Sequence, residues 1–183
     1  MIRAIRVALI LAGLAALALF LYSRRAHLAA KLWHWRHGST TVLRGYAIDV
    51  PEDWLPAVDE NEGTAILIDT QPANTADPTT VAGIVIVSIG GHPIQDLNDQ
   101  ISKVQNRLQR EGLKQIEEQV IQLGDERLVC LGGSELHDIL HAADAAIVSY
   151  ECYSTGRLIL SFTGSRKGLQ EFYRIASSIR RQG

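Results

Sequence analysis

The sequence has no acidic residue in its first 44 positions, although 20 aspartates and glutamates occur among its 183 residues. That stretch holds seven basic residues and therefore carries a formal charge of +7. The rest of the chain holds the other eleven basic residues and all 20 acidic ones, so it carries −9. The net charge of −2 is thus the sum of a basic head and an acidic body. An acidic body repels phosphate, which disfavours nucleic acid as a partner.

Cysteine is scarce as well, with two residues in the whole chain, and this count excludes a disulfide-dense scaffold. A composition of 46% hydrophobic and 21% charged residues also excludes a disordered or collagen-like chain. No nucleophile elbow of the form G-x-S-x-G, phosphate-binding loop or dinucleotide-binding glycine pattern occurs in the sequence. We therefore expect a protein without catalytic activity and without a cofactor.

The two cysteines, Cys130 and Cys152, each lie in a segment that reads as a β-strand. If those strands are neighbours, the two side chains face each other at disulfide distance. The alternative is a pair of buried free thiols that pack as small apolar groups. Neither cysteine belongs to a C-x-x-C pair, so zinc binding is not expected. A disulfide is the prediction that we carry forward.

The basic head contains a long apolar run. Residues 7–22 include no charged side chain, and with residues 4–6 the run reaches 19 residues. At 1.5 Å per residue a helix of this length spans about 28 Å, which is close to the thickness of a bilayer core. A cleaved signal peptide is the alternative, but Arg24 and Arg25 follow the run where a small-residue cleavage site belongs. We expect residues 1–23 to form an uncleaved membrane anchor, with residues 4–22 in contact with lipid.

Residues 24–43 are expected to form a basic and aromatic juxtamembrane stalk. Trp33 and Trp35 suit the headgroup region of a membrane, and the neighbouring cations suit anionic lipid. The alternative is a helical stalk whose tryptophans pack on the body. Three histidines lie in this segment without a carboxylate or thiol among them, so a metal site is not expected there.

The orientation of the anchor is contested by two arguments. Four basic residues follow the apolar run within residues 24–36 and two precede it, which favours a cytoplasmic body by the positive-inside rule. A short basic N-terminus before a signal-like helix is instead typical of export, and the cysteine pair favours an oxidising compartment. We expect a single-pass protein of a bacterial inner membrane with an extracytoplasmic body, and a cytoplasmic body is the alternative.

The body, residues 44–183, alternates between strand and helix patterns. Strands are predicted at 46–50, 65–69, 81–89, 113–123, 126–136, 145–153 and 157–163, and helices at 94–110 and 167–181. The segment 81–89 is apolar at nearly every position, which predicts a central strand covered on both faces. Short links between consecutive strands imply a mainly antiparallel sheet, and the two amphipathic helices are expected to cover it. The predicted fold class is α+β, an α/β/α sandwich preceded by one transmembrane helix.

A short motif opens the body. It comprises Tyr46, Pro51 and Trp54 within the sequence YAIDVPEDW. Together with the order of elements over residues 44–181, it resembles the PsbP/Mog1/DcrB-like α/β/α sandwich family. The resemblance implies a fold whose members mostly bind protein partners, and it brings no catalytic residues with it. From the residues alone, Pro51 ends a strand and Trp54 closes the edge of the core.

The densest group of chemically versatile side chains lies at residues 135–144. His137 and His141 stand four residues apart and are weak candidates for a metal site on one helical face. The spacing reads H-D-x-x-H, and the segment connects two predicted strands, so a solvated acidic loop is the preferred interpretation. A metal-dependent enzyme that uses these histidines is the alternative function.

The function expected from these patterns is a membrane-tethered, non-catalytic protein-binding module that acts as an envelope accessory or assembly factor. The acidic body favours a protein partner with a basic surface, because opposite charge steers association. A secretion-system immunity protein or chaperone is an alternative within the same class, by analogy with the family that the body resembles.

Overall fold

A computed structural model of the chain describes residues 24–70, 83–90, 92–111, 113, 116–134 and 147–182. The predicted transmembrane segment at residues 4–22 lies outside these ranges, as do His137 and His141. Within the described ranges, no helix has both the length and the apolar character needed to cross a membrane.

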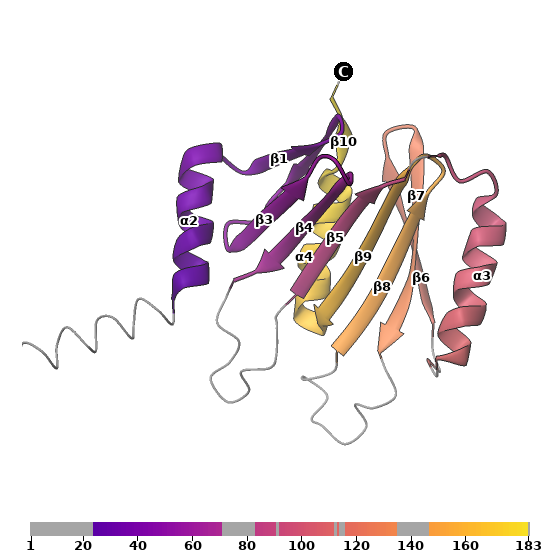
Figure 1. Cartoon of the computed structure of the whole chain (residues 1–183). Coiled ribbons are helices and arrows are strands. Elements are labelled where there is room, and N and C mark those ends of the chain that lie inside the picture. The colour runs from indigo at the N-terminus through magenta and orange to yellow at the C-terminus, as the bar shows by residue number, and fades with distance from the viewer. Residues whose placement is uncertain are drawn as a thin grey trace, which may run out of the picture.

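The described elements are three helices and ten strands (Figure 1). The helices are α2 (Arg25–His37), α3 (Leu97–Arg110) and α4 (Arg166–Ser178). The strands are β1 (Thr40–Leu43), β2 (Tyr46–Asp49), β3 (Trp54–Asp59), β4 (Thr64–Asp69), β5 (Gly83–Ile89), β6 (Glu117–Leu123), β7 (Glu126–Ser134), β8 (Ile147–Ser154), β9 (Leu158–Ser165) and β10 (Arg180–Arg181).

The strands form two sheets in which every neighbouring pair is antiparallel. The larger sheet has seven strands in the order β3-β4-β5-β9-β8-β7-β6, and the smaller one has the order β1-β2-β10. The α+β class and the antiparallel sheet are therefore confirmed.

Helix α4 covers one face of the large sheet, which we call the inner face. Its apolar side, with Phe172 and Ile175, is buried in the main core, and the ring of Phe172 stacks on Phe162 of β9 with centroids 5.1 Å apart. The helix begins at a Ser165 cap whose hydroxyl accepts the amide of Gly168. This cap and the apolar stripe explain why the segment is a helix that packs on the sheet.

Helix α3 lies on the opposite face, which we call the outer face. Its buried residues Leu97, Val104 and Leu108 share a second apolar cluster with Val129 and Leu131 of β7. The Asp96 side chain caps the helix by accepting the amide of Asp99. The predicted stripe along this helix is confirmed, and helices on both faces make the body an α+β sandwich.

The last predicted helix differs from the structure at its end. The apolar pattern predicts a helix to residue 181, but α4 ends at Ser178 and Arg180–Arg181 pair with β2 as strand β10. The Ser178 hydroxyl donates to the carbonyl of Ile175 and accepts the backbone amide of Asp49. A serine side chain that hydrogen-bonds to backbone groups in this way competes with the next turn of the helix. The predicted end of this helix is therefore wrong.

Two further strands, β1 and β3, were not predicted. Strand β3 contains Pro56, which lacks an amide donor, and it lies at an edge of the large sheet where such a residue is tolerated. Strand β1 pairs with β2 from Thr40 to Leu43. The segment predicted as a stalk thus contributes α2 and β1 to the folded unit.

Helix α2 packs on the body through one side. Ala30 is fully buried, Trp33 packs against the main core, and His34 Nε2 lies 2.9 Å from the carbonyl oxygen of Pro51. Trp35, by contrast, is 81% exposed. Trp33 therefore follows the alternative of packing on the body, whereas Trp35 does not.

Candidate functional site

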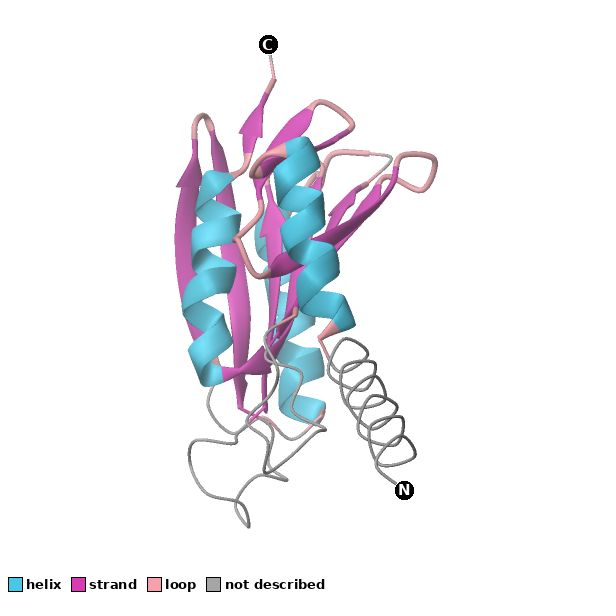
Figure 2. Cartoon of the chain, turned by 90° about the vertical axis from the view of Figure 1, so that its left-hand side faces the viewer, coloured by secondary structure: helices cyan, strands magenta, loops and turns pink. Residues whose placement is uncertain are grey.

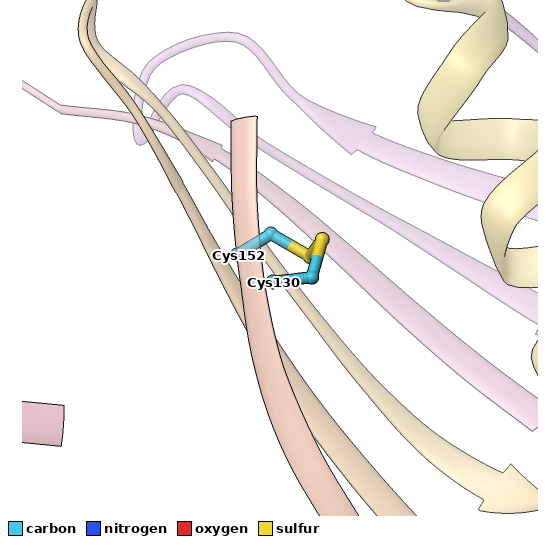
Figure 3. The surroundings of a disulfide bond; sticks show 2 residues. All are labelled: Cys130 and Cys152. Atoms are coloured by element: carbon cyan, nitrogen blue, oxygen red, sulfur yellow. A yellow bond between two sulfur atoms is a disulfide. The ribbon is translucent and has the colours of Figure 1, made fainter. Parts of the chain in front are cut away.

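The two cysteines form a disulfide between neighbouring strands. Cys130 of β7 is paired in register with Cys152 of β8, and both residues are fully buried in the core under α4 (Figure 3). The predicted pairing is confirmed, and the alternative of two free thiols is wrong. Because the bridge is buried on both strands, its role is to hold the sheet together.

The residues of the family-like motif join the small sheet to the large one. The Tyr46 hydroxyl donates to Glu126 Oε1 over 3.2 Å, and the guanidinium of Arg181 lies over the Tyr46 ring, 5.5 Å from its centroid. The amide of Trp54 donates to the carbonyl of Pro51 over 2.9 Å, and the Trp54 side chain is 2% exposed. All of these contacts are internal to the fold.

The histidine pair, His137 and His141, lies outside the described residues, so the metal hypothesis stays a prediction. In the parts of the chain that the structure describes, no group of three or more His, Cys, Asp or Glu side chains is placed to hold a metal ion.

A hollow of about 730 Å³ lies where β2, the end of β5 and the turn after β8 meet. Arg44, Arg157 and Arg181 are among its lining residues. Two of these cations already bind partners inside the protein: Arg44 donates to the carbonyls of Glu60 and Asn61, and Arg181 pairs with Glu126. Internal hydrogen bonds and an ion pair therefore stabilise the walls of the hollow. The guanidinium donors of Arg44 and Arg181 are largely occupied by these contacts.

An apolar area on the outer face of β3, β4 and β5, which we call the uncovered face, has no internal explanation among the described residues. In Figure 1 this face of the sheet is turned toward the reader, with α4 behind it and α3 at the far end beside β6 and β7. The apolar side chains of this area are Leu55, Ile66, Ile68, Ile84 and Ile86. Ile68 is 38% exposed and Ile86 is 36% exposed, and the other three are half-buried.

The register of the strands gathers these side chains into rows. Leu55, Ile68 and Ile84 are directly opposite one another across three strands, and Ile66 lies opposite Ile86 in the next row. Directly opposed residues of antiparallel strands have Cβ atoms about 5 Å apart, so the five side chains form one continuous apolar surface.

Charged groups border the uncovered face on the side of α3. Arg107 of α3 binds the carboxylate of Glu151 on β8, and the Tyr153 hydroxyl donates to the same carboxylate over 2.6 Å. Burial, together with this hydrogen bond, raises the pKa of Tyr153 to about 12. The hydrogen bond to Glu151 raises the pKa of Arg107, so the guanidinium is charged at any physiological pH.

An acidic turn closes the uncovered face at one end of β3 and β4. Asp59, Glu60 and Glu62 are all exposed there. The Asp59 carboxylate accepts the amides of Asn61 and Glu62 at 3.0 and 3.1 Å, which fixes the turn. The apolar surface is thus bordered by an ordered group of negative charges.

The uncovered face corrects one prediction. The segment 81–89 is expected to be covered on both faces because it is apolar throughout, and Val85 and Val87 on the inner face are indeed fully buried. On the outer face, Ile86 stays exposed, because α3 lies over β7 and β8 and no described residue covers β5. The sequence signal for this site is a strand with apolar side chains on both of its faces. The same pattern is typical of a strand whose two faces are both covered.

In comparisons with known proteins, no protein-family model matches the chain and no curated protein matches its sequence.

Proposed function

We propose that this protein is a membrane-tethered, non-catalytic module that binds a protein partner through the uncovered face. The observation that carries the proposal is the apolar surface on β3, β4 and β5, in which Ile68 and Ile86 are exposed and the other three side chains are half-buried. Water-exposed apolar patches of this kind mark interaction surfaces in folded proteins, because covering them releases hydration free energy.

The partner is a protein with an apolar surface bordered by lysines and arginines. Asp59, Glu60 and Glu62 place negative charge at the end of the uncovered face, and residues 45–183 together carry −9. Opposite charges at the rim of an interface raise the association rate and align the partner, while the apolar centre supplies most of the affinity.

The tether is the apolar segment at residues 4–22, and the compartment is the outer side of a bacterial inner membrane. The buried disulfide supports this side, because disulfides persist in oxidising compartments. The positive charges after the segment support the cytoplasmic alternative. Digestion of spheroplasts with external protease, which removes only an extracytoplasmic body, distinguishes the two orientations.

The YAIDVPEDW motif and the predicted order of elements resemble those of the PsbP/Mog1/DcrB-like proteins, and on that resemblance we propose an accessory or assembly role in the envelope. A secretion-system immunity protein or chaperone fits the same surface. The metal-dependent enzyme remains an alternative that rests on His137 and His141. Zinc-dependent thermal stabilisation that disappears in His137→Ala would favour it.

The double variant Ile68→Lys/Ile86→Lys is expected to stop co-purification of the partner from detergent-solubilised membranes. Removing two lysine ammonium groups from water at the centre of the uncovered face costs free energy, and their positive charge repels a basic partner. The retained amount is expected to fall at least about tenfold, which corresponds to about 1.4 kcal/mol.

The matched control is Val120→Lys, which changes an apolar residue that is 51% exposed on β6, at the opposite edge of the sheet. This variant is expected to retain the partner fully. Both variants should keep the melting temperature of the unmodified chain. Equal retention by the double variant and the control would place the interface elsewhere, and absence of any specific partner would count against a binding module.

A further inference from the structure

Helix α2 presents an apolar stripe on the side that faces away from the body. Leu28 is 46% exposed, Leu32 is 48% exposed and Trp35 is 81% exposed. Their spacing of four and three residues places the three side chains on one side of the helix. A row of this kind, ending in an almost fully exposed indole, is costly to leave in water.

Other residues of α2 attach the helix to the body, where Ala30 is fully buried and Trp33 packs against the main core. Lys31 Nζ lies 2.6 Å from the Glu52 carboxylate, and the two ring nitrogens of His34 lie 2.9 Å from the carbonyl oxygen of Pro51 and 3.0 Å from that of Gly38. The exposed stripe therefore has a fixed direction relative to the sheet. Figure 2 shows the molecule from the side on which α2 lies.

The charged side chains of α2 are all basic. Arg25 and Arg36 are exposed on this helix, and the chain contains no acidic residue before Asp49. The helix begins at Arg25, three residues after the uncharged run at residues 7–22 ends. Exposed leucines, an exposed indole and basic side chains this close after the uncharged run match the juxtamembrane pattern in which tryptophans and cations lie among lipid headgroups.

We propose that the Leu28–Leu32–Trp35 stripe of α2 lies on an anionic bilayer at the level of the headgroups. This inference rests on the proposed tether and adds an orientation to it. Because α2 packs along β3, contact of the stripe with lipid turns the β3 edge of the sheet toward the membrane and the β6 edge away from it. The body attached to the tether then has a fixed orientation relative to the membrane.

The test measures tryptophan fluorescence of the full chain reconstituted in vesicles of phosphatidylcholine and phosphatidylglycerol, with and without brominated acyl chains. Bromine quenches an indole only at close range, and the chain has three tryptophans, at positions 33, 35 and 54. Trp54 is buried and Trp33 packs against the core. We expect brominated lipid to quench the unmodified chain and Trp33→Phe, and to leave Trp35→Phe largely unquenched.

A second variant tests the contribution of charge. Arg36→Gln should shift the equilibrium between lipid-bound and released helix by about fivefold toward release, since one basic residue near an anionic surface contributes about that factor. The effect should disappear in vesicles of phosphatidylcholine alone.

Three results would overturn the inference, and they differ in whether the proposed tether also fails. If the chain floats with the vesicles and Trp35→Phe is quenched as strongly as the unmodified chain, the stripe does not touch lipid while the tether stands. If the chain does not float with vesicles, the tether fails together with the inference. A concentration-dependent dimer that is broken by Leu32→Lys and shows no bromine quenching would assign the stripe to a second copy of the chain. The partner-binding proposal is tested separately through the uncovered face and is unaffected by these outcomes.

Discussion

Replacing both cysteines by alanine is expected to lower the free energy of unfolding by about 3 kcal/mol, because the bridge closes a loop in the unfolded chain whose ends are 22 residues apart. Alanine is chosen since Cys130 and Cys152 are fully buried and a serine hydroxyl would be left without a partner there. For a protein of this size the loss corresponds to a fall of about 10 °C in melting temperature. Thermal unfolding of the full chain in detergent, followed by circular dichroism, measures it.

The control for this experiment is the unmodified chain after reduction of the disulfide under denaturing conditions and refolding with the thiols blocked from reoxidation. It should lose a similar amount of stability, since it shares the loss of the cross-link. A melting temperature that is unchanged by Cys130→Ala/Cys152→Ala would show that the bridge does not stabilise the sheet.

Trp54→Ala is expected to cost about 4 kcal/mol, the usual size of the loss when a buried tryptophan is truncated. Trp54 is 2% exposed and belongs to the main core. It also packs over Gly83 of β5, where the Cβ of any larger residue would lie 3.0 Å from the indole and 2.9 Å from the Phe162 ring. Because Gly83 has no side chain, the Trp54 indole occupies the space beside it. Alanine at position 54 would therefore leave a cavity next to this glycine.

The matched substitution is Trp35→Ala, which removes an indole that is 81% exposed. We expect its effect on the free energy of unfolding, measured by urea titration, to be within about 0.5 kcal/mol, as for surface substitutions in general. Comparable losses for the two variants would mean that Trp54 does not anchor the core.

The disulfide and the helix stripes were predictable because they depend on local periodicity. Cys130 and Cys152 each alternate with apolar neighbours along a strand, and the apolar residues of α3 recur every three or four positions. Strand β3 was missed because its local sequence, with Pro56 near its middle, argues against a strand. Only its position at a sheet edge makes that proline acceptable, and edge position is a property of the assembled sheet.

The uncovered face was not predictable for a related reason. The pattern of α3 shows that Val104 and Leu108 are buried, but it does not show which strands they cover. That choice depends on the strand order, in which β5 pairs with β4 and β9 while α3 packs over β7 and β8. Sequence alone therefore indicates that Ile84 and Ile86 are apolar, and the topology decides that Ile86 is exposed and Ile84 only half-buried.

Site-specific photocrosslinking in intact membranes tests the central claim most directly. A photoreactive phenylalanine derivative replaces Ile86 on the uncovered face or, as the control, Val120 on β6. The account predicts a discrete adduct with another protein from position 86 and none from position 120, and loss of the adduct when Asp59, Glu60 and Glu62 are all replaced by lysine. Equal crosslinking from both positions, or an adduct from position 120 alone, would contradict a binding module that uses the uncovered face.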